Sequence, residues 1–220
     1  MRAGPSPAAL PLAIDLRDLP VVCVGAGRVA AGKVSALLAA GARVTVVAPQ
    51  ADERVQALCG SQTLRWLPRG YRDQDLDGAV LVIAATDDPA TNARVAADAA
   101  AQSTLCVRVD GGGTAEFAAV LRRGPVTVAV STGGAAPALA RRLRDQLASA
   151  VGAEYGLLAD LLGQLRADPK VQTALAALPA EARAAKWRAI LDTDILSLLR
   201  DGEQTTAREV ATACLFSSSD

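Results

Sequence analysis

A glycine-rich turn near the start of the chain has the residue types and spacing to hold a phosphate group. The apolar run Val21–Val24 leads into Gly25–Gly27, and Ala30 follows three residues later. Gly25 permits the turn, Gly27 leaves no side chain between the backbone and a pyrophosphate, and Ala30 lets the next helix pack close to the strand. The free N–H groups at the start of that helix would face the anion. The pattern predicts a dinucleotide in contact with Gly25, Ala26, Gly27, Arg28 and Val29.

Two further polar groups follow apolar runs that are typical of buried strands. Thr86–Asp88 follows the run 79–85, and Asp110 follows the run 105–109. In an open α/β sheet, ligands bind at the carboxyl ends of the strands, so these residues are candidates for a site. We expect Asp110 to be catalytic, with a turn-forming role as the alternative, and Asp88 to cap the helix that follows it.

The end of the second apolar run bears on the choice between NAD and NADP. Enzymes of this fold that use NAD usually carry Asp or Glu there, to bind the ribose hydroxyls. Here the residues are Ala48, Pro49 and Gln50, of which Gln50 could make a weaker ribose contact. Because no arginine follows directly to meet a 2′-phosphate, we expect NAD. The predicted cofactor contacts outside the first turn are Pro49, Gln50, Thr86 and Asp87.

A second glycine turn and a group of arginines could bind a ligand with several carboxylates. Ser131–Gly134 precedes a predicted helix, which makes this turn a second candidate anion site. Guanidinium groups recognise carboxylates through paired hydrogen bonds. The arginines in question are Arg108, Arg122, Arg123, Arg141 and Arg142. The alternative for each of them, taken singly, is a solvated surface charge.

The elements that must position these residues change in kind along the chain. Alternating strands and helices over the first half predict an α/β fold with a Rossmann-like doubly wound parallel sheet. Expected strands at 117–121 and 126–130 follow without a helix between them, and the chain is then almost wholly helical. Two or three helices are expected over 154–200. We expect an NAD-binding Rossmann-like domain at 1–112, a dimerisation and linking segment at 113–150, and a helical C-terminal domain at 151–220.

The composition narrows the classes of function. The 220 residues carry 23 Lys and Arg against 23 Asp and Glu, with 3% aromatic residues, which argues against nucleic-acid binding. The absence of histidine excludes Ser-His-Asp and Cys-His catalysis and histidine metal sites, and we expect no metal site. The four cysteines form no C-x-x-C pair, and neither a signal peptide nor a bilayer-spanning apolar run is expected. These features favour a cytoplasmic protein.

Motifs that follow one another over residues 11–150 carry a resemblance to a known family. They are Pro11–Leu12 with Asp15–Arg17, Val24–Ala30 with Lys33, Gly41–Pro49, Ala84–Asp88, Asn92, Val109–Asp110, Phe117, and Val130–Gly134 with Pro137, Leu139 and Ala140. The chain resembles the siroheme synthase N-terminal family, which holds precorrin-2 dehydrogenases and bifunctional precorrin-2 dehydrogenase/sirohydrochlorin ferrochelatases. A joint match of this kind is more specific than the glycine motif alone.

The resemblance implies NAD-dependent dehydrogenation of precorrin-2 to sirohydrochlorin in siroheme biosynthesis and, in bifunctional members, Fe2+ chelation that yields siroheme. It implies that Asp110 is the key catalytic residue for both steps and that the chain forms an intertwined homodimer. The expected contacts to substrate carboxylates are Ser131, Thr132, Gly133, Gly134, Arg108 and Arg141. The alternatives are a dehydrogenase for another substrate and a non-catalytic NAD-binding or NAD-sensing module.

Three departures from the family pattern border the expected substrate site. Gly111–Gly113 stands where the family often has a proline, Val107 replaces a common asparagine, and Val120 replaces a usual proline. These differences bear on the identity of the substrate and on the chelatase step.

Overall fold

The computed structural model describes residues 9–59 and 63–217. The chain divides into two compact units, Met1–Phe117 with Gly133–Ala135, and Ala118–Thr132 with Ala136–Asp220. The three segments expected from the sequence, with boundaries at residues 112 and 150, stay a prediction.

The first unit is built on a parallel sheet of five strands in the order β3-β2-β1-β4-β5. The strands are β1 (Pro20–Val24), β2 (Arg43–Val47), β3 (Leu64–Leu67), β4 (Leu81–Ala84) and β5 (Leu105–Arg108). The strand order reverses at β1, because β2 lies on one side of it and β4 on the other. This is the position at which doubly wound folds open a crevice for ligands. The predicted fold class is confirmed.

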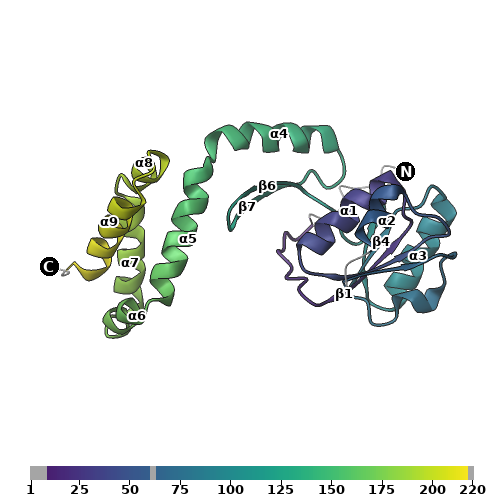
Figure 1. The fold of residues 1–220 in the computed structure, drawn as a ribbon, viewed down its shortest axis with the longest axis horizontal. Helices are drawn as coiled ribbons and strands as arrows, with labels where there is room; N and C mark the ends of the chain where they lie inside the picture. The colour runs from purple at the N-terminus through teal and green to yellow at the C-terminus, as the bar shows by residue number, and fades with distance from the viewer. Residues whose placement is uncertain (1–8, 60–62, 218–220) are drawn as a thin grey trace, which may run out of the picture. The chain divides into compact units, whose positions relative to one another are not determined.

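Helices cover both faces of the sheet (Figure 1). They are α1 (Arg28–Ala39), α2 (Glu53–Leu58), α3 (Pro89–Ala101) and the 3₁₀ turn η1 (Asp73–Leu76). Helices α1 and α2 bury Val34 and Val55 against one face, while α3 and η1 bury Val95 and Leu76 against the other. Successive residues of each strand point to opposite faces, so the two central strands, β1 and β4, are apolar along their whole length and fill both cores.

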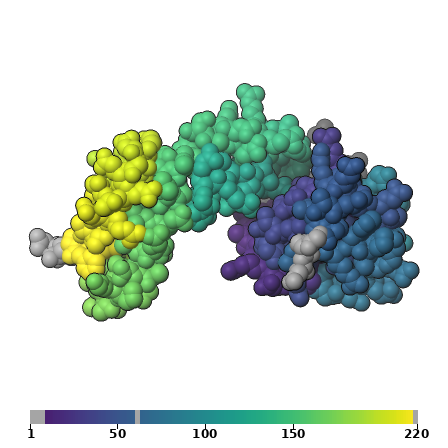
Figure 2. Space-filling view, viewed as in Figure 1, coloured from purple at the N-terminus to yellow at the C-terminus, as the bar shows by residue number. Residues whose placement is uncertain are grey.

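The second unit begins with a hairpin of β6 (Ala119–Arg123) and β7 (Val126–Val130), which pair antiparallel. The hairpin packs against α4 (Pro137–Ala150). Five helices follow and share one core: α5 (Ala153–Ala167), α6 (Pro169–Ala176), α7 (Ala180–Leu191), α8 (Ile195–Arg200) and α9 (Gln204–Phe216). Their side chains form one closely packed body, drawn from green to yellow in Figure 2.

The expectation of two or three helices over 154–200 is wrong, because four helices, α5 to α8, occupy this range. The predicted breaks at 168–169 and 178–179 are correct. The break between α7 and α8 was missed because it contains neither glycine nor proline. At this break, the Thr193 hydroxyl donates a hydrogen bond of 2.7 Å to the Ile190 carbonyl at the end of α7.

No helix in the described part of the chain, residues 9–59 and 63–217, has the length and hydropathy needed to cross a bilayer.

Candidate dinucleotide and catalytic site

The two glycines of the first turn serve different purposes. Gly25 has φ of 103°, which favours glycine, and a Cβ there would collide with the carbonyl oxygen of Ala85. Gly27 has ordinary extended backbone, and a Cβ there would meet nothing within 4 Å. The fold therefore requires Gly25, whereas Gly27 keeps the space in front of α1 open. Ala30 is fully buried, as expected for the third small residue of the pattern.

The start of α1 is free of side-chain caps. Gly27 is its N-cap residue and offers no side chain to the first N–H groups of the helix. These groups and the helix dipole can therefore face an anion. Among the predicted cofactor residues, Arg28 and Val29 occupy the first turn of this helix, and Val29 is exposed.

The loop after β2 is fixed to the glycine turn. The backbone N–H of Asp52 donates a hydrogen bond of 2.9 Å to the carbonyl of Ala26. Pro49 and Gln50 lie in this loop and are exposed. The predicted contacts on β1 and β2 thus lie at the same edge of the sheet, where a dinucleotide would cross it.

The turn after β4 is held by a buried asparagine. Asn92 on α3 is 1% exposed, and its Oδ1 accepts hydrogen bonds from the Thr86 backbone N–H (3.1 Å) and hydroxyl (2.8 Å). Its Nδ2 donates to the Thr86 carbonyl at 3.1 Å. Three hydrogen bonds from one side chain therefore fix Thr86 beside Gly25. The sequence showed Asn92 only as part of the family resemblance and gave no sign of this role.

Asp88 caps α3, as predicted. Its carboxylate accepts hydrogen bonds from the backbone N–H groups of Ala90 (3.0 Å) and Thr91 (3.1 Å) and from the Thr91 hydroxyl (2.6 Å). The Thr91 hydroxyl, followed by the two backbone groups, lowers the pKa of Asp88. The neighbouring Asp87 is exposed at the end of β4 and stays a predicted cofactor contact.

Asp110 lies in the turn after β5 and forms a two-pronged ion pair with Arg108. Arg108 Nε donates to Asp110 Oδ1 at 3.0 Å, and Arg108 Nη2 donates to Asp110 Oδ2 at 2.9 Å. The guanidinium lowers the pKa of Asp110, with a smaller contribution from the Asn92 side chain. Asp110 is therefore ionised at neutral pH and can accept a proton.

The glycines after Asp110 let the chain turn back along β5. Gly111 and Gly112 have φ of 91° and 82°. A Cβ on Gly113 would collide with the Cys106 carbonyl, so only glycine permits this approach. Beyond the turn, the Ala115 N–H donates to the Cys106 carbonyl at 2.9 Å. The Gly111–Gly113 departure from the family pattern thus has a structural role at the catalytic candidate.

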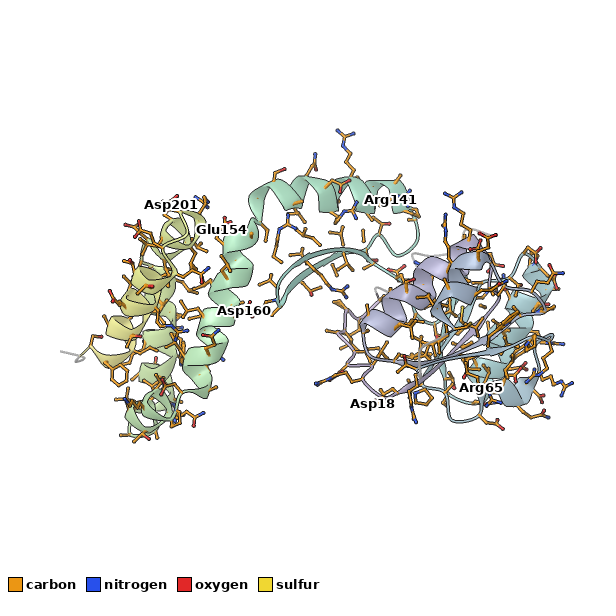
Figure 3. All side chains as sticks on the ribbon, viewed as in Figure 1. Asp18, Arg65, Arg141, Glu154, Asp160 and Asp201 are labelled. Carbon is orange, nitrogen blue, oxygen red and sulfur yellow. The ribbon has the colours of Figure 1, made fainter. Side chains whose placement is uncertain are left out.

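The predicted substrate contacts are divided between the two units. Arg108, Gly133 and Gly134 group with the first unit, and Ser131, Thr132 and Arg141 with the second. The Thr132 hydroxyl accepts a hydrogen bond of 3.1 Å from the backbone N–H of Ala136. Arg141 is exposed on α4 (Figure 3). Their role in substrate binding stays a prediction.

One arginine of the group considered as carboxylate ligands has a structural role instead. Arg123 Nε donates to the Val151 carbonyl at 3.0 Å, and Arg123 Nη2 donates to the Ala148 carbonyl at 3.3 Å. These carbonyls lie at the end of α4, where helices leave acceptors unpaired. Arg123 is therefore a helix cap.

Cys23 and Cys106 have the features of core residues. Cys23 is fully buried, and burial raises the pKa of its thiol to about 12. Burial also raises the pKa of Cys106, which is 1% exposed. Within the described ranges, no group of three or more Cys, Asp or Glu side chains could hold a metal ion.

Comparison with known proteins agrees with this geometry. Residues 12–119 match a family model described as NAD(P)-binding, and residues 123–150 match one described as sirohaem biosynthesis protein central. A siroheme synthase of Thioalkalivibrio sulfidiphilus is 38% identical over 220 residues, covering 96% of this chain and 42% of the relative. A siroheme synthase of Azotobacter vinelandii is 39% identical over 209 residues, covering 94% of this chain and 44% of the relative.

A solved structure of SirC, precorrin-2 dehydrogenase, has the same fold. It superimposes with a TM-score of 0.71 at 24% identity, covering 91% of this chain and 98% of the other. This chain spans less than half the length of the siroheme synthases that it matches. Two findings assign this chain to a family. Two family models match it in succession, and relatives match almost all of its length. The chain belongs to the siroheme synthase N-terminal family.

Proposed function

We propose that this chain dehydrogenates precorrin-2 to sirohydrochlorin with NAD as the hydride acceptor. The observation that carries the proposal is the arrangement at one edge of an NAD(P)-binding sheet. There, Gly25 and Gly27 open a turn in front of α1, Asn92 fixes Thr86 beside that turn, and the ionised Asp110 lies in the turn after β5. This combination offers a dinucleotide site and a proton acceptor on neighbouring strands.

The reaction removes one hydride and one proton from the substrate. NAD, when bound at the glycine turn, supplies the chemistry that takes the hydride. Asp110 accepts the proton, which requires its carboxylate to be ionised before the step. An aspartate whose pKa lies at or below its ordinary value meets this requirement at neutral pH. Ser131, Gly134 and Arg141 would hold carboxylates of the tetrapyrrole.

A second activity, insertion of Fe2+ into sirohydrochlorin, would use the same carboxylate. Metal entry displaces the two pyrrole N–H protons, which a general base must accept. Asp110 is our candidate for this step too, with Fe2+ as a substrate. The family resemblance supports this part of the proposal.

A homodimer would cover an apolar stripe on α4. Leu139, Leu143 and Leu147 recur every fourth residue, and their exposed fractions are 49%, 39% and 37%. Leucines exposed at helical spacing are typical of a surface that packs against another chain. The stripe lies within residues 123–150, which match the sirohaem biosynthesis model. The expected cytoplasmic location stays a prediction.

The decisive experiment is an anaerobic incubation of the purified protein with NAD+ and enzymatically generated precorrin-2. The absorbance of NADH and of sirohydrochlorin is recorded over time. Formation of the two products in equal amounts would support the proposed dehydrogenase activity. Addition of Fe2+ to the same cuvette then tests chelation. NAD+ binding without turnover would favour the non-catalytic NAD module, and turnover of a different reduced substrate would favour another dehydrogenase.

A further inference from the structure

Arg108 and Asp110 are two residues apart in the sequence, and their side chains form a bidentate ion pair. Both Arg108 donors reach the carboxylate, at 3.0 and 2.9 Å, one on each oxygen. The pair is partly shielded from water, because the Arg108 side chain is 20% exposed and that of Asp110 is 28% exposed. A bidentate pair of this kind fixes the orientation of a carboxylate as well as its charge.

The glycine loop makes room for this pair. Gly112 has a left-handed backbone, and a Cβ on it would lie 3.4 Å from Arg108 Nη1. Gly113 brings the returning chain so close that a Cβ would lie 2.9 Å from the Arg108 backbone nitrogen. The loop therefore lies close to Arg108 at two places, with Gly112 beside its guanidinium and Gly113 beside its backbone nitrogen. Larger side chains here would press on the guanidinium or push the loop from β5.

The groups that favour the ionised Asp110 carboxylate are Arg108 on β5, the Asn92 amide on α3 and the backbone N–H of Asp110 itself. The nearest other titratable group is the Cys106 thiol on β5, whose pKa Asp110 helps to raise. Arg108 carries the charge that favours the ionised carboxylate, and it is the strongest of these influences. Cys106 is buried with a raised pKa, so it stays neutral and competes little.

We propose that Arg108 is a positioning residue, whose two-point ion pair holds the Asp110 carboxylate in one orientation beside the Gly111–Gly113 loop. The role rests on the proposed function only in that Asp110 is the base of the dehydrogenation. It differs from the substrate contact that the sequence predicts for Arg108. A substrate ligand acts mainly on KM, whereas a positioning residue acts through Asp110 on kcat and on its pH dependence.

The first test titrates the Asp110 carboxyl by carbon-13 NMR in the full chain, without substrate. In the wild type, Asp110 should titrate below the ordinary Asp value of about 3.9. In Arg108→Met its midpoint should rise by roughly one pH unit or more, since an opposite charge has been removed. Arg108→Lys keeps the positive charge but loses the paired N–H donors of the guanidinium. Its titration midpoint should therefore lie between those of the wild type and Arg108→Met. Equal midpoints in all three proteins would overturn the proposal.

A matched control removes one arginine elsewhere. Arg65 is exposed on β3, at the opposite edge of the sheet from β5, and is labelled in Figure 3. Arg65→Met changes the net charge by the same amount and should leave the Asp110 midpoint unchanged. An equal shift in this control would show a general charge effect and would contradict a specific role for Arg108.

The second test measures turnover of precorrin-2 against pH. Arg108→Met should lower kcat by about tenfold and move the acid limb of the profile to higher pH, with KM unchanged. A raised KM with unchanged kcat would assign Arg108 to the substrate and overturn the positioning role. If the wild type turns over no precorrin-2, the proposed function fails, but the NMR titration still decides whether Arg108 controls Asp110.

Discussion

The carbonyl oxygen of Ala85 lies where a Cβ on Gly25 would have to stand. The turn after β1 therefore passes against the end of β4 with no side chain between them. On its other side, the Gly25 N–H donates to the Val47 carbonyl at 2.9 Å. The turn is thus held from both neighbouring strands, and its shape exists before any cofactor binds.

This relationship predicts different outcomes for alanine at the two glycines. Gly25→Ala should lower the free energy of unfolding by about 2–4 kcal/mol, because it adds backbone strain and a collision. Gly27→Ala should leave stability within about 0.5 kcal/mol but raise the Kd for NAD+ at least roughly tenfold, since its methyl enters the open space before α1. Urea unfolding and calorimetric titration measure the two effects. Equal loss of stability in both variants would contradict the assignment.

Asp110→Asn tests the catalytic base. The amide has nearly the same shape but cannot accept the proton, so kcat for precorrin-2 should fall by about 100-fold or more. NAD+ affinity should be unchanged, because Asp110 lies outside the predicted cofactor contacts. Stopped-flow measurement of NADH formation decides the point. A variant as fast as the wild type would remove Asp110 from the mechanism.

Asn92→Leu tests the buried clamp on Thr86. It removes three hydrogen bonds and leaves polar groups of Thr86 unpaired, so the free energy of unfolding should fall by about 2–3 kcal/mol. Ala93→Leu places the same residue at the next, exposed position of α3 and should change stability by less than about 0.5 kcal/mol. Urea titrations of both variants make the comparison, and equal stabilities would contradict the clamp.

The pair of Asp75 and Arg69 gives the fold a dependence on pH. Asp75 accepts hydrogen bonds from Arg69 at 2.8 and 2.5 Å, and this guanidinium lowers its pKa. Because the pKa of Asp75 is lower in the folded state than in the unfolded state, its ionisation stabilises the fold at pH values above the unfolded pKa of about 3.9. This stabilisation is lost as the pH falls through the folded-state pKa. Asp75→Asn should therefore destabilise the protein at pH 7.

The acid limb distinguishes this pair from a general charge effect. Between pH 5 and pH 3, measured stability should fall less steeply in Asp75→Asn than in the wild type. Asp73→Asn, an exposed neighbour in η1, should keep the wild-type slope. Urea midpoints measured across this pH range give the slopes. Identical slopes in all three proteins would contradict a stabilising role of the Asp75–Arg69 pair.

Leu143→Lys tests the proposed homodimer. A charge in the middle of the α4 stripe should shift the protein to the monomer, measured as molar mass by light scattering after size exclusion. Ser149→Lys places the same charge on an exposed position of α4 outside the stripe and should leave the mass unchanged. A wild-type monomer, or a Leu143→Lys dimer, would contradict an interface at this stripe.

Much of the fold was predictable because its signals are local. The apolar runs that became β1, β2 and β4 each had to fill two cores, and Asp88 has the side chain that caps a helix at its own position. The break between α7 and α8 was not predictable. Neither glycine nor proline marks it, and Ile190 and Ile195 on its two sides pack into one core.

The sequence by itself determined the chemical inventory: a glycine turn that can face a pyrophosphate, one well-placed acid in Asp110, and no histidine. Only the tertiary structure decided how that acid is held. The pairing of Arg108 with Asp110 depends on the path of the glycine loop, and the clamp of Asn92 on Thr86 depends on how α3 seats against β4. Such contacts are set by backbone angles and packing between elements, which residue types and spacing along the chain do not fix.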